Sequence, residues 1–180
     1  MTKFGLHFIQ NVNPRKEDHF KEKKLYRYRS KKAKQYTTII ELEIYEKNNC
    51  VISFYQKNLG NDKNKYRRRA HLSAGHILAI LTSCIEAYAE LEYDHSFIFS
   101  AANDLGENIE ENKRFSLYDK FLERRFPKYE EYERNGSIAT NTLMLFHRSF
   151  QYKNDALEFF RKFKEKTIQN IINSNQDFNE

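Results

Sequence analysis

Basic side chains gather near the N-terminus of this sequence and alternate there with tyrosines. Residues 1–35 carry 11 Lys or Arg against 3 Asp or Glu, a net charge of +8, whereas residues 36–180 carry 20 against 22, a net charge of −2. Clustered cations attract phosphate backbones and acidic protein surfaces, and neighbouring aromatic rings offer faces on which bases can stack. The candidate partner contacts are Lys23, Lys24, Arg27, Arg29, Lys31 and Lys32, interleaved with Tyr26, Tyr28 and Tyr36.

A second interpretation of the same pattern is structural. On a β-strand, the alternation of Tyr26 and Tyr28 with Arg27 and Arg29 also arises from one buried face and one solvated face. A solvated basic segment without a specific ligand is a third interpretation, and the sequence leaves all three open. No RNA- or DNA-binding motif accompanies the charge, so a protein partner is slightly favoured over nucleic acid.

Neither metal nor thiol chemistry is indicated by the sequence. The six histidines are dispersed, and His71, His76 and His95 show no spacing typical of metal ligands, so no metal site is expected. Cys50 and Cys84 are far apart and form no CxxC pair, which indicates neither a disulfide framework nor a zinc site. Cys84 falls within a predicted helix and is expected to be a small core residue.

Length and hydropathy indicate one soluble domain. A chain of 180 residues can build one real core and is short for two. The N-terminus does not follow the signal-peptide pattern, and no apolar run approaches the roughly 20 residues needed to span a bilayer. We therefore expect a cytoplasmic protein that does not contact membranes, with a basic N-terminal segment over residues 1–35 and one domain over residues 36–180.

The elements that must position these residues are organised around the stretch from Phe97 to Phe126. Phe97–Phe99 is an unbroken apolar run, which predicts a strand buried on both faces. A polar loop containing Asn103 follows, and Leu117, Phe121 and Leu122 then recur at helical spacing. This succession of strand, loop and helix is typical of an α/β core.

Strands are predicted before this stretch. The apolar residues from Phe4 to Val12 predict a short edge strand, followed by a turn at Pro14 and a basic connector. Ile40, Leu42 and Ile44 alternate with Glu41 and Glu43, so residues 36–45 and 50–55 are expected to form a hairpin. Residues 65–71, which include Arg67, Arg68 and Arg69, are expected to add a third antiparallel strand and complete a meander.

Helices and one more strand complete the predicted fold. Ser73 is the expected N-cap for a helix over residues 74–92, and a terminal amphipathic helix begins at Asp155. Residues 129–134 are expected to form a polar helical turn that ends at Asn135-Gly136, and residues 143–146 form a buried strand. The predicted fold is α/β (α+β), with an antiparallel meander continuing into a mixed sheet on which helices pack.

This order of elements resembles the core of the GNAT acetyltransferase superfamily. In that family a strand ending near an Asn leads to a helix of the form A-x-x-x-Y-x-x-x-G-F, and here Asn103 follows the strand while Tyr118 and Phe126 lie in the helix. The sequence is also similar to small bacterial proteins with a degenerate version of that core, in which an R-x-x-L-F/Y helix matches Arg114, Leu117 and Tyr118. The resemblance covers roughly residues 36–150.

The resemblance implies roles for particular residues. Acetyl-CoA would be held by Arg68, Arg69, Ser73 and Asn103, Tyr118 would protonate the departing thiolate, and Glu41 or Glu43 would accept the amine proton. However, His71 and Ser73 stand where the family has a glycine and a small residue that let phosphates approach the helix N-terminus.

Two functions follow from this comparison. The first is a non-enzymatic or degenerate GNAT-like binding module, without a cofactor, that acts on a protein or nucleic-acid partner, for example in bacterial defence, phage counter-defence or a toxin–antitoxin system. The alternative is an acetyl-CoA-dependent N-acyltransferase with an atypical phosphate loop.

Overall fold

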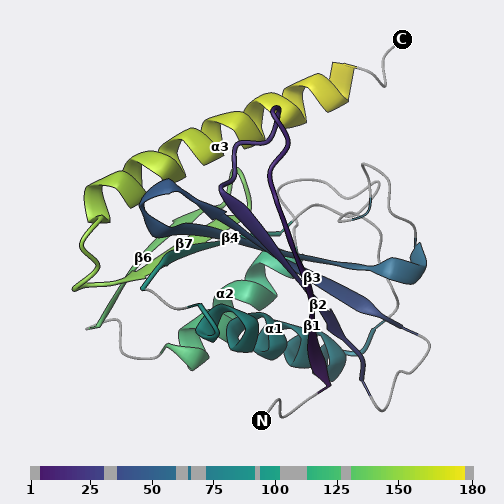
Figure 1. Ribbon diagram of the computed structural model, residues 1–180. Helices are drawn as coiled ribbons and strands as arrows, with labels where there is room; N and C mark the ends of the chain where they lie inside the picture. The colour runs from purple at the N-terminus through teal and green to yellow at the C-terminus, as the bar shows by residue number, and fades with distance from the viewer. Residues whose placement is uncertain are drawn as a thin grey trace.

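One mixed sheet lies at the centre of the fold, with helices packed on both of its faces (Figure 1). A computed structural model describes residues 5–30, 36–59, 65, 72–91, 94–101, 113–126 and 131–176. The strands in that part of the chain are β1 (Leu6–Val12), β2 (Glu22–Tyr28), β3 (Thr38–Tyr45), β4 (Asn49–Gln56), β5 (Ser96–Ser100), β6 (Tyr132–Ser137) and β7 (Thr142–His147). The helices are α1 (Ala74–Ala89), α2 (Lys113–Arg125) and α3 (Lys153–Gln176), with 3-10 turns η1 (Glu46–Asn48) and η2 (Lys57–Leu59).

The first four strands form an antiparallel meander. β1 pairs with β2, β2 with β3 and β3 with β4, and the turn η1 joins β3 to β4. The predicted edge strand and hairpin are therefore confirmed. The described part of the basic segment supplies two strands to the same sheet as the rest of the chain. Of the third strand predicted over residues 65–71, only Lys65 lies within the described residues.

The sheet becomes mixed where α1 connects β4 to β5. These two strands are parallel and pair from Asn49↔Ser96 to Ile52↔Phe99, while β4 continues to Gln56. The helix α1 begins at the predicted N-cap Ser73, whose side chain accepts a hydrogen bond from the backbone N–H of His76. Its apolar positions, including Leu81 and Cys84, pack against the sheet, as the helical spacing predicts.

The last part of the sheet is the hairpin of β6 and β7, in which the second strand, β7, is the one that pairs with β5. β7 lies between β5 and β6 and is antiparallel to both, so the order across the sheet is β1-β2-β3-β4-β5-β7-β6. The predicted helical turn over residues 129–134 is wrong, because Tyr132–Ser137 forms β6. Its six residues pair with β7, and this pairing within the hairpin overrides a local sequence of low β propensity.

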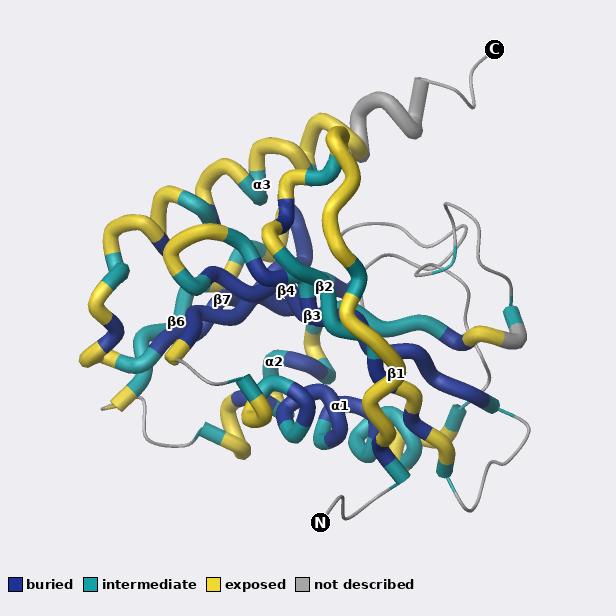
Figure 2. Tube along the Cα trace, viewed as in Figure 1, coloured by how far each residue is buried: buried dark blue, intermediate teal, exposed yellow. Residues whose placement is uncertain are grey.

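Two hydrophobic cores fill the space on the two faces of the sheet. α1 and α2 cover one face, where Ile40, Phe97 and Tyr118 belong to one buried cluster. α3 covers part of the other face through Ala156 and Phe160, which pack against strand residues such as Ile98. The buried strands form a layer between helices whose outer sides are exposed (Figure 2).

Candidate binding cleft

The residues predicted for acid and base catalysis lie on opposite faces of the sheet. Tyr118 is in the core beneath α1 and α2, together with Ile40 and Leu42 of β3. Side chains alternate between the two faces along a strand, so Glu41 and Glu43 project to the α3 side. The sheet thus separates the phenol from both carboxylates.

Tyr118 is a buried aromatic residue above the point where the pairing of β4 and β5 ends. Its ring centroid lies 5.9 Å from that of Phe54 on β4 and 5.9 Å from that of Phe99 on β5. Phe99 belongs to the last β4–β5 pair, and Phe54 lies two residues beyond its partner Ile52. Burial raises the pKa of Tyr118 well above its ordinary value, and Arg114 offsets this only in part. The phenol is therefore held in its neutral form.

Glu41 is engaged in a buried ion pair. The whole residue is 3% exposed, and its carboxylate lies 2.9 Å from the ammonium of Lys65. The same ammonium lies 4.2 Å from the ring centroid of Tyr55, which adds a cation–π contact. Before it could accept a proton from a substrate, Glu41 would have to give up a charged partner.

Glu43 lies at the mouth of a cleft and is contacted from two sides. The Lys23 ammonium is 2.7 Å from its Oε1, and the Tyr45 hydroxyl donates to its Oε2 at 2.9 Å. Burial opposes the charge on Lys23, yet the hydrogen bond with Glu43 raises the pKa of Lys23 above its ordinary value. Burial, reinforced by Glu43, also raises the pKa of Tyr45. This group is a fixed polar cluster.

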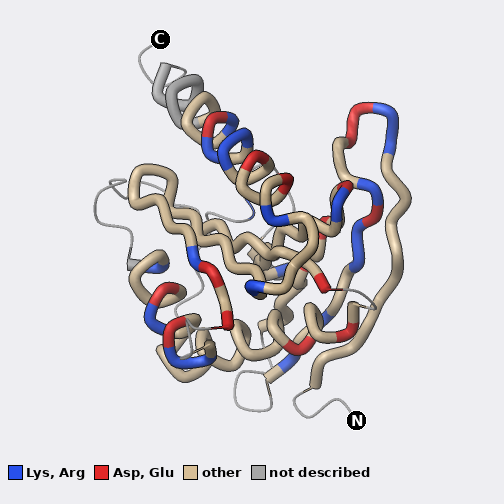
Figure 3. The backbone as a smooth tube through the Cα atoms, turned by 90° about the vertical axis from the view of Figure 1, so that its left-hand side faces the viewer, with Lys and Arg blue, Asp and Glu red and all other residues tan. Residues whose placement is uncertain are grey.

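The cleft itself has a volume of about 750 Å³ and lies between three segments that are distant in the sequence. One wall is the connection from β1 to β2, another is the end of β3, and the third is the middle of α3. Figure 3 shows the β1–β2 connection and α3 as separate arms that both carry basic and acidic residues. The lining residues are Glu17, Asp18, His19, Phe20, Lys23, Glu43, Tyr45, Glu46, Phe159, Lys162, Phe163, Lys166, Thr167 and Asn170.

Aromatic rings and charges of both signs define the chemistry of this cleft. Tyr45 and Phe159 pack with ring centroids 4.8 Å apart, and Phe163 follows Phe159 one helical turn later. The cleft is also lined by four acidic residues and three lysines, which are Glu17, Asp18, Glu43 and Glu46, and Lys23, Lys162 and Lys166. Such a surface can hold an extended ligand with apolar side chains and charged groups of both signs.

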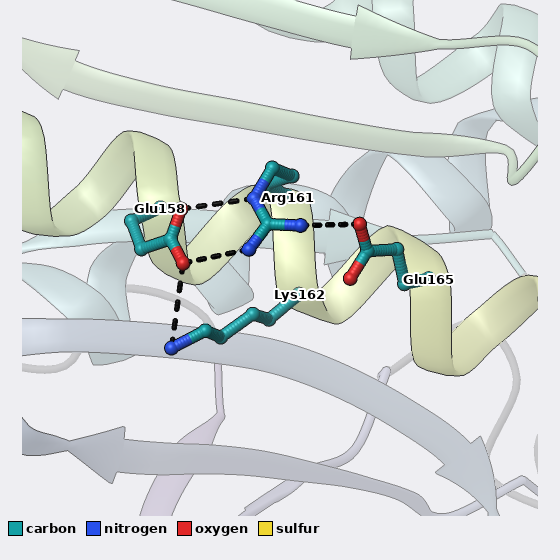
Figure 4. Close-up of polar contacts among 4 residues, drawn as sticks. All are labelled: Glu158, Arg161, Lys162 and Glu165. Atoms are coloured by element: carbon teal, nitrogen blue, oxygen red, sulfur yellow. Dashed lines mark hydrogen bonds and ion pairs between the residues drawn. The ribbon is translucent and has the colours of Figure 1, made fainter.

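An ion-pair network on the exposed side of α3 borders the cleft (Figure 4). Arg161 donates two hydrogen bonds to Glu158, at 2.9 and 2.8 Å, and one to Glu165 at 2.5 Å. Lys162, which lines the cleft, lies 3.4 Å from Glu158. The hydrogen bonds from Arg161 lower the pKa of Glu158 to about 2. Of these four residues, Lys162 also lines the cleft, so the network meets the cleft at that side chain.

The predicted basic contacts do not form one continuous patch. Lys23 and Arg27 share the α3 side of β2, whereas Lys24 is on the other side with Glu22, 4.0 Å away. The Arg29 guanidinium donates to the Thr37 hydroxyl at 3.2 Å. Lys31 and Lys32 lie outside the described residues.

The two tyrosines between these basic residues belong to the core. Tyr26 and Tyr28 are 2% and 6% exposed and pack in the cluster beneath α1 and α2. They are not available to stack on bases. Of the three interpretations that the sequence left open, the structural one applies to Tyr26 and Tyr28, which lie on the buried face of a strand.

The start of α1, where the resemblance would place a phosphate, is capped by the protein. Ser73 Oγ accepts from His76 N at 3.4 Å and also lies 2.9 Å from His76 Nδ1. One of the N–H groups that an anion would use is therefore engaged. Arg68, Arg69 and His71, which the resemblance places near this site, lie outside the described residues, as does Asn103, to which it assigns a part in holding the cofactor.

The cleft was not predicted from the sequence, although Glu43 and Lys23 were both singled out for other roles. The helix predicted from Asp155 contains Phe159 and Phe163, to which no binding role was assigned. The only sequence signal for the cleft is the number of aromatic residues in this helix, which is more than one buried helix face can hold. That signal predicts a binding surface only if the β1–β2 connection is known to face α3.

No protein-family model, curated protein or solved structure matches the chain. Within the described ranges, no group of three or more His, Cys, Asp or Glu residues could hold a metal ion. No helix in the described part of the chain is long and apolar enough to cross a membrane.

Proposed function

We propose that this protein is a binding module with a degenerate GNAT-like fold, and that it holds a segment of a protein partner in the cleft beside α3. The observation that carries the proposal is the composition of the cleft, with its aromatic side chains and charges of both signs within about 750 Å³. A polypeptide offers apolar side chains and charges of either sign, and can match both features.

The GNAT-like part of the proposal is supported by the topology. An antiparallel meander passes through α1 into a strand parallel to β4, and the two parallel strands stop pairing at Ile52↔Phe99. In the acetyltransferases the corresponding strands splay apart around the pantetheine of the cofactor. Tyr118, which the resemblance assigns as the general acid, lies beside this point, with ring contacts to Phe54 and Phe99.

The degenerate part rests on the chemistry around those residues. Tyr118 contacts aromatic rings on both strands, Glu41 is paired with Lys65, and Ser73 caps the helix that would receive the phosphates. The contacts of Glu41 and Ser73 engage groups that acetyl transfer would need, and the ring contacts of Tyr118 hold that residue in the core. A module that only binds a partner can keep all of these contacts as they are.

A protein partner is favoured over nucleic acid by the charges of the cleft. Binding to a phosphate backbone depends on a surplus of cations along the contact surface. The cleft instead has four acidic and three basic side chains besides His19, and Lys23 is paired with Glu43. Phosphates entering it would meet carboxylates.

A peptide library panned against the full chain tests the proposal directly. We expect enriched peptides with apolar and charged residues, whose affinity is then measured by calorimetry on the purified protein. Asn170→Trp fills the cleft and should weaken their binding by roughly tenfold or more, whereas Ile168→Trp on the same helix outside the cleft should not. Peptides that bind both variants equally, or the absence of enrichment, would contradict the proposal.

The alternative function, an acetyl-CoA-dependent N-acyltransferase, is favoured by one observation, the position of Tyr118 above the end of the β4–β5 pairing. It requires the phenol to reach a thiolate and a base to act from across the sheet. Binding of acetyl-CoA decides between the two functions, because a peptide-binding module has no need for it.

A further inference from the structure

We propose that the cleft orders the charges of the segment it binds, with the segment's acidic side chains along α3 and its basic side chains along the sheet. This assignment rests on the proposed function, because it concerns the polypeptide segment held in the same cleft. The lining residues form two walls, the α3 wall between residues 159 and 170 and the sheet wall between residues 17 and 46. All four acidic lining residues belong to the sheet wall, and the α3 wall contains two lysines and no acid.

The sheet wall keeps a surplus of negative charge. The lysine that it contributes, Lys23, is paired with Glu43 at 2.7 Å. Glu17 and Glu46 are exposed, and Asp18 accepts a backbone hydrogen bond at 2.9 Å, which holds its carboxylate without neutralising it. The two basic residues that precede Glu17 do not line the cleft. Three carboxylates therefore remain on this wall, where they favour cationic side chains of a partner.

The α3 wall keeps positive charge. Lys162 and Lys166 are both exposed. Glu158 lies 3.4 Å from Lys162 but already accepts two hydrogen bonds from Arg161. Among the described residues, no ion pair joins Lys166 to a carboxylate. Both ammonium groups can therefore contact carboxylates of a partner.

The two walls meet at aromatic rings and do not neutralise each other. Tyr45 of the sheet wall packs on Phe159 of the α3 wall with ring centroids 4.8 Å apart, and the Phe163 centroid lies 6.4 Å from that of Phe159. In the part of the chain that the structure describes, no ion pair crosses from one wall to the other. An apolar side chain placed on these rings therefore brings the charged side chains on its two flanks beside opposite charges.

Charges sorted in this way select the orientation of the bound segment. Reversing the segment would place its carboxylates against the sheet wall and its cations against the lysines of α3. Each exposed ion pair changes an affinity by only a few fold, so the discrimination comes from several charges acting together. The lining positions from Phe159 to Asn170 span about 16 Å of helix at 1.5 Å per residue, a length that roughly five extended residues cover.

Panning a random heptapeptide library against proteins of altered charge tests the assignment. The unmodified chain should enrich peptides that combine acidic, basic and apolar residues. Lys166→Glu makes the α3 wall less basic, so its peptides should contain fewer acidic and more basic residues. Lys164→Glu changes the net charge equally on the same helix. Because Lys164 contacts the Phe160 ring and does not line the cleft, this control should enrich the same peptides as the unmodified chain.

Calorimetry at low salt, where exposed charges are least screened, shows which wall each charge contacts. Replacing the acidic residues of an enriched peptide with their amides should weaken binding roughly two- to fivefold per residue, and this loss should disappear when Lys162 and Lys166 are both changed to Gln. Replacing its basic residues with Gln should weaken binding similarly, and that loss should shrink when Glu17 and Glu46 are both changed to Gln. Glu123→Gln, at an exposed residue of α2 on the other face of the sheet, should alter neither loss.

The outcomes separate this assignment from the proposed function. Peptides that Asn170→Trp displaces, but whose charges couple to neither wall or to the opposite walls, would overturn the assignment and leave peptide binding in the cleft standing. The same conclusion would follow if Lys166→Glu and the unmodified chain enriched the same peptides. A library that yields no binder would overturn the proposed function, and this assignment with it.

Discussion

Lys23 on β2 lies directly opposite Glu43 on β3, and the two form a 2.7 Å ion pair at the mouth of the cleft. The pair is largely shielded, with side chains 19% and 22% exposed, and Glu43 also accepts from the Tyr45 hydroxyl. A lysine predicted to bind a partner and a glutamate predicted to act as a base therefore neutralise each other. This relationship gives the first prediction.

Removing the cation should destabilise the fold modestly. Lys23→Met should lower the free energy of unfolding by on the order of 1 kcal/mol, since the carboxylate loses a partner but keeps the Tyr45 hydroxyl. Urea unfolding measures the change. In a double-mutant cycle with Glu43→Gln, a coupling energy indistinguishable from zero would show that the pair contributes nothing.

Acetyl-CoA should bind weakly or not at all. Ser73 caps α1, and in the proposed resemblance Ser73 and His71 would stand where the acetyltransferases bring their backbone close to phosphates. Calorimetry should show no saturable heat, and the ligand should leave the melting temperature unchanged. A dissociation constant in the low micromolar range that is lost in Tyr118→Phe or Arg68→Ala would make the acyltransferase the better proposal.

Leu81 should be essential to the core beneath α1. It is 1% exposed, so Leu81→Ala should lower the free energy of unfolding by on the order of 2–5 kcal/mol through lost transfer energy and a cavity. Leu157→Ala, at a residue 41% exposed on α3, is the matched control and should cost much less. Equal effects of the two substitutions on urea unfolding would contradict the packing of α1.

Stability should fall at alkaline pH. Burial is the main cause that raises the pKa of Tyr26, Tyr45, Tyr88 and Tyr118 above the ordinary value of 10.0. A raised pKa in the folded state means that the stabilisation is complete below pH 10 and is lost as the unfolded tyrosines ionise above it. Urea unfolding at rising pH should show the loss, and Tyr45→Phe should reduce its slope. Unchanged stability between about pH 9 and pH 11 would be inconsistent with these buried phenols.

Glu158 should titrate at unusually low pH. Its pKa of about 2, against an ordinary 4.5, comes first from the hydrogen bonds with Arg161. A lowered pKa contributes stability above pH 4.5 that is lost as the pH falls toward 2. Arg161→Ala should return the pKa, measured by NMR, toward 4.5, while Lys164→Ala should leave it low. A pKa near 4.5 in the unmodified protein would show that the network is not maintained in solution.

The elements with strong local patterns could be predicted from the sequence. The alternation of Ile40, Leu42 and Ile44 with two glutamates indicated β3, and Ser73 followed by apolar steps of three and four indicated α1. In both cases residues close in the sequence show which face is buried, because side chains return to the same face every two residues in a strand and every 3.6 residues in a helix. The buried strands β5 and β7 were predicted from a different signal, short unbroken apolar runs of the kind that strands covered on both faces carry.

β6 could not be predicted in this way. Tyr132–Ser137 has charged residues and an Asn-Gly pair that favour a turn, and it forms a strand because β7 offers six pairing partners. Its Gly136 faces Leu143 so closely that an added Cβ would lie 3.2 Å from the leucine Cδ2. Such a contact depends on a neighbour that only the folded sheet supplies.

The sequence by itself determined the alternation that places Tyr26 and Tyr28 on one face of β2 and Arg27 on the other, but not which face the core covers. Only the tertiary structure decided that the tyrosines are buried, that Tyr118 and Glu43 lie on opposite faces, and that Glu43 meets Lys23. The cleft likewise exists because residues 17–23, 43–46 and 159–170 converge in space. Local spacing specifies directions along one element, whereas a site depends on distances between elements, which the packing of both cores sets.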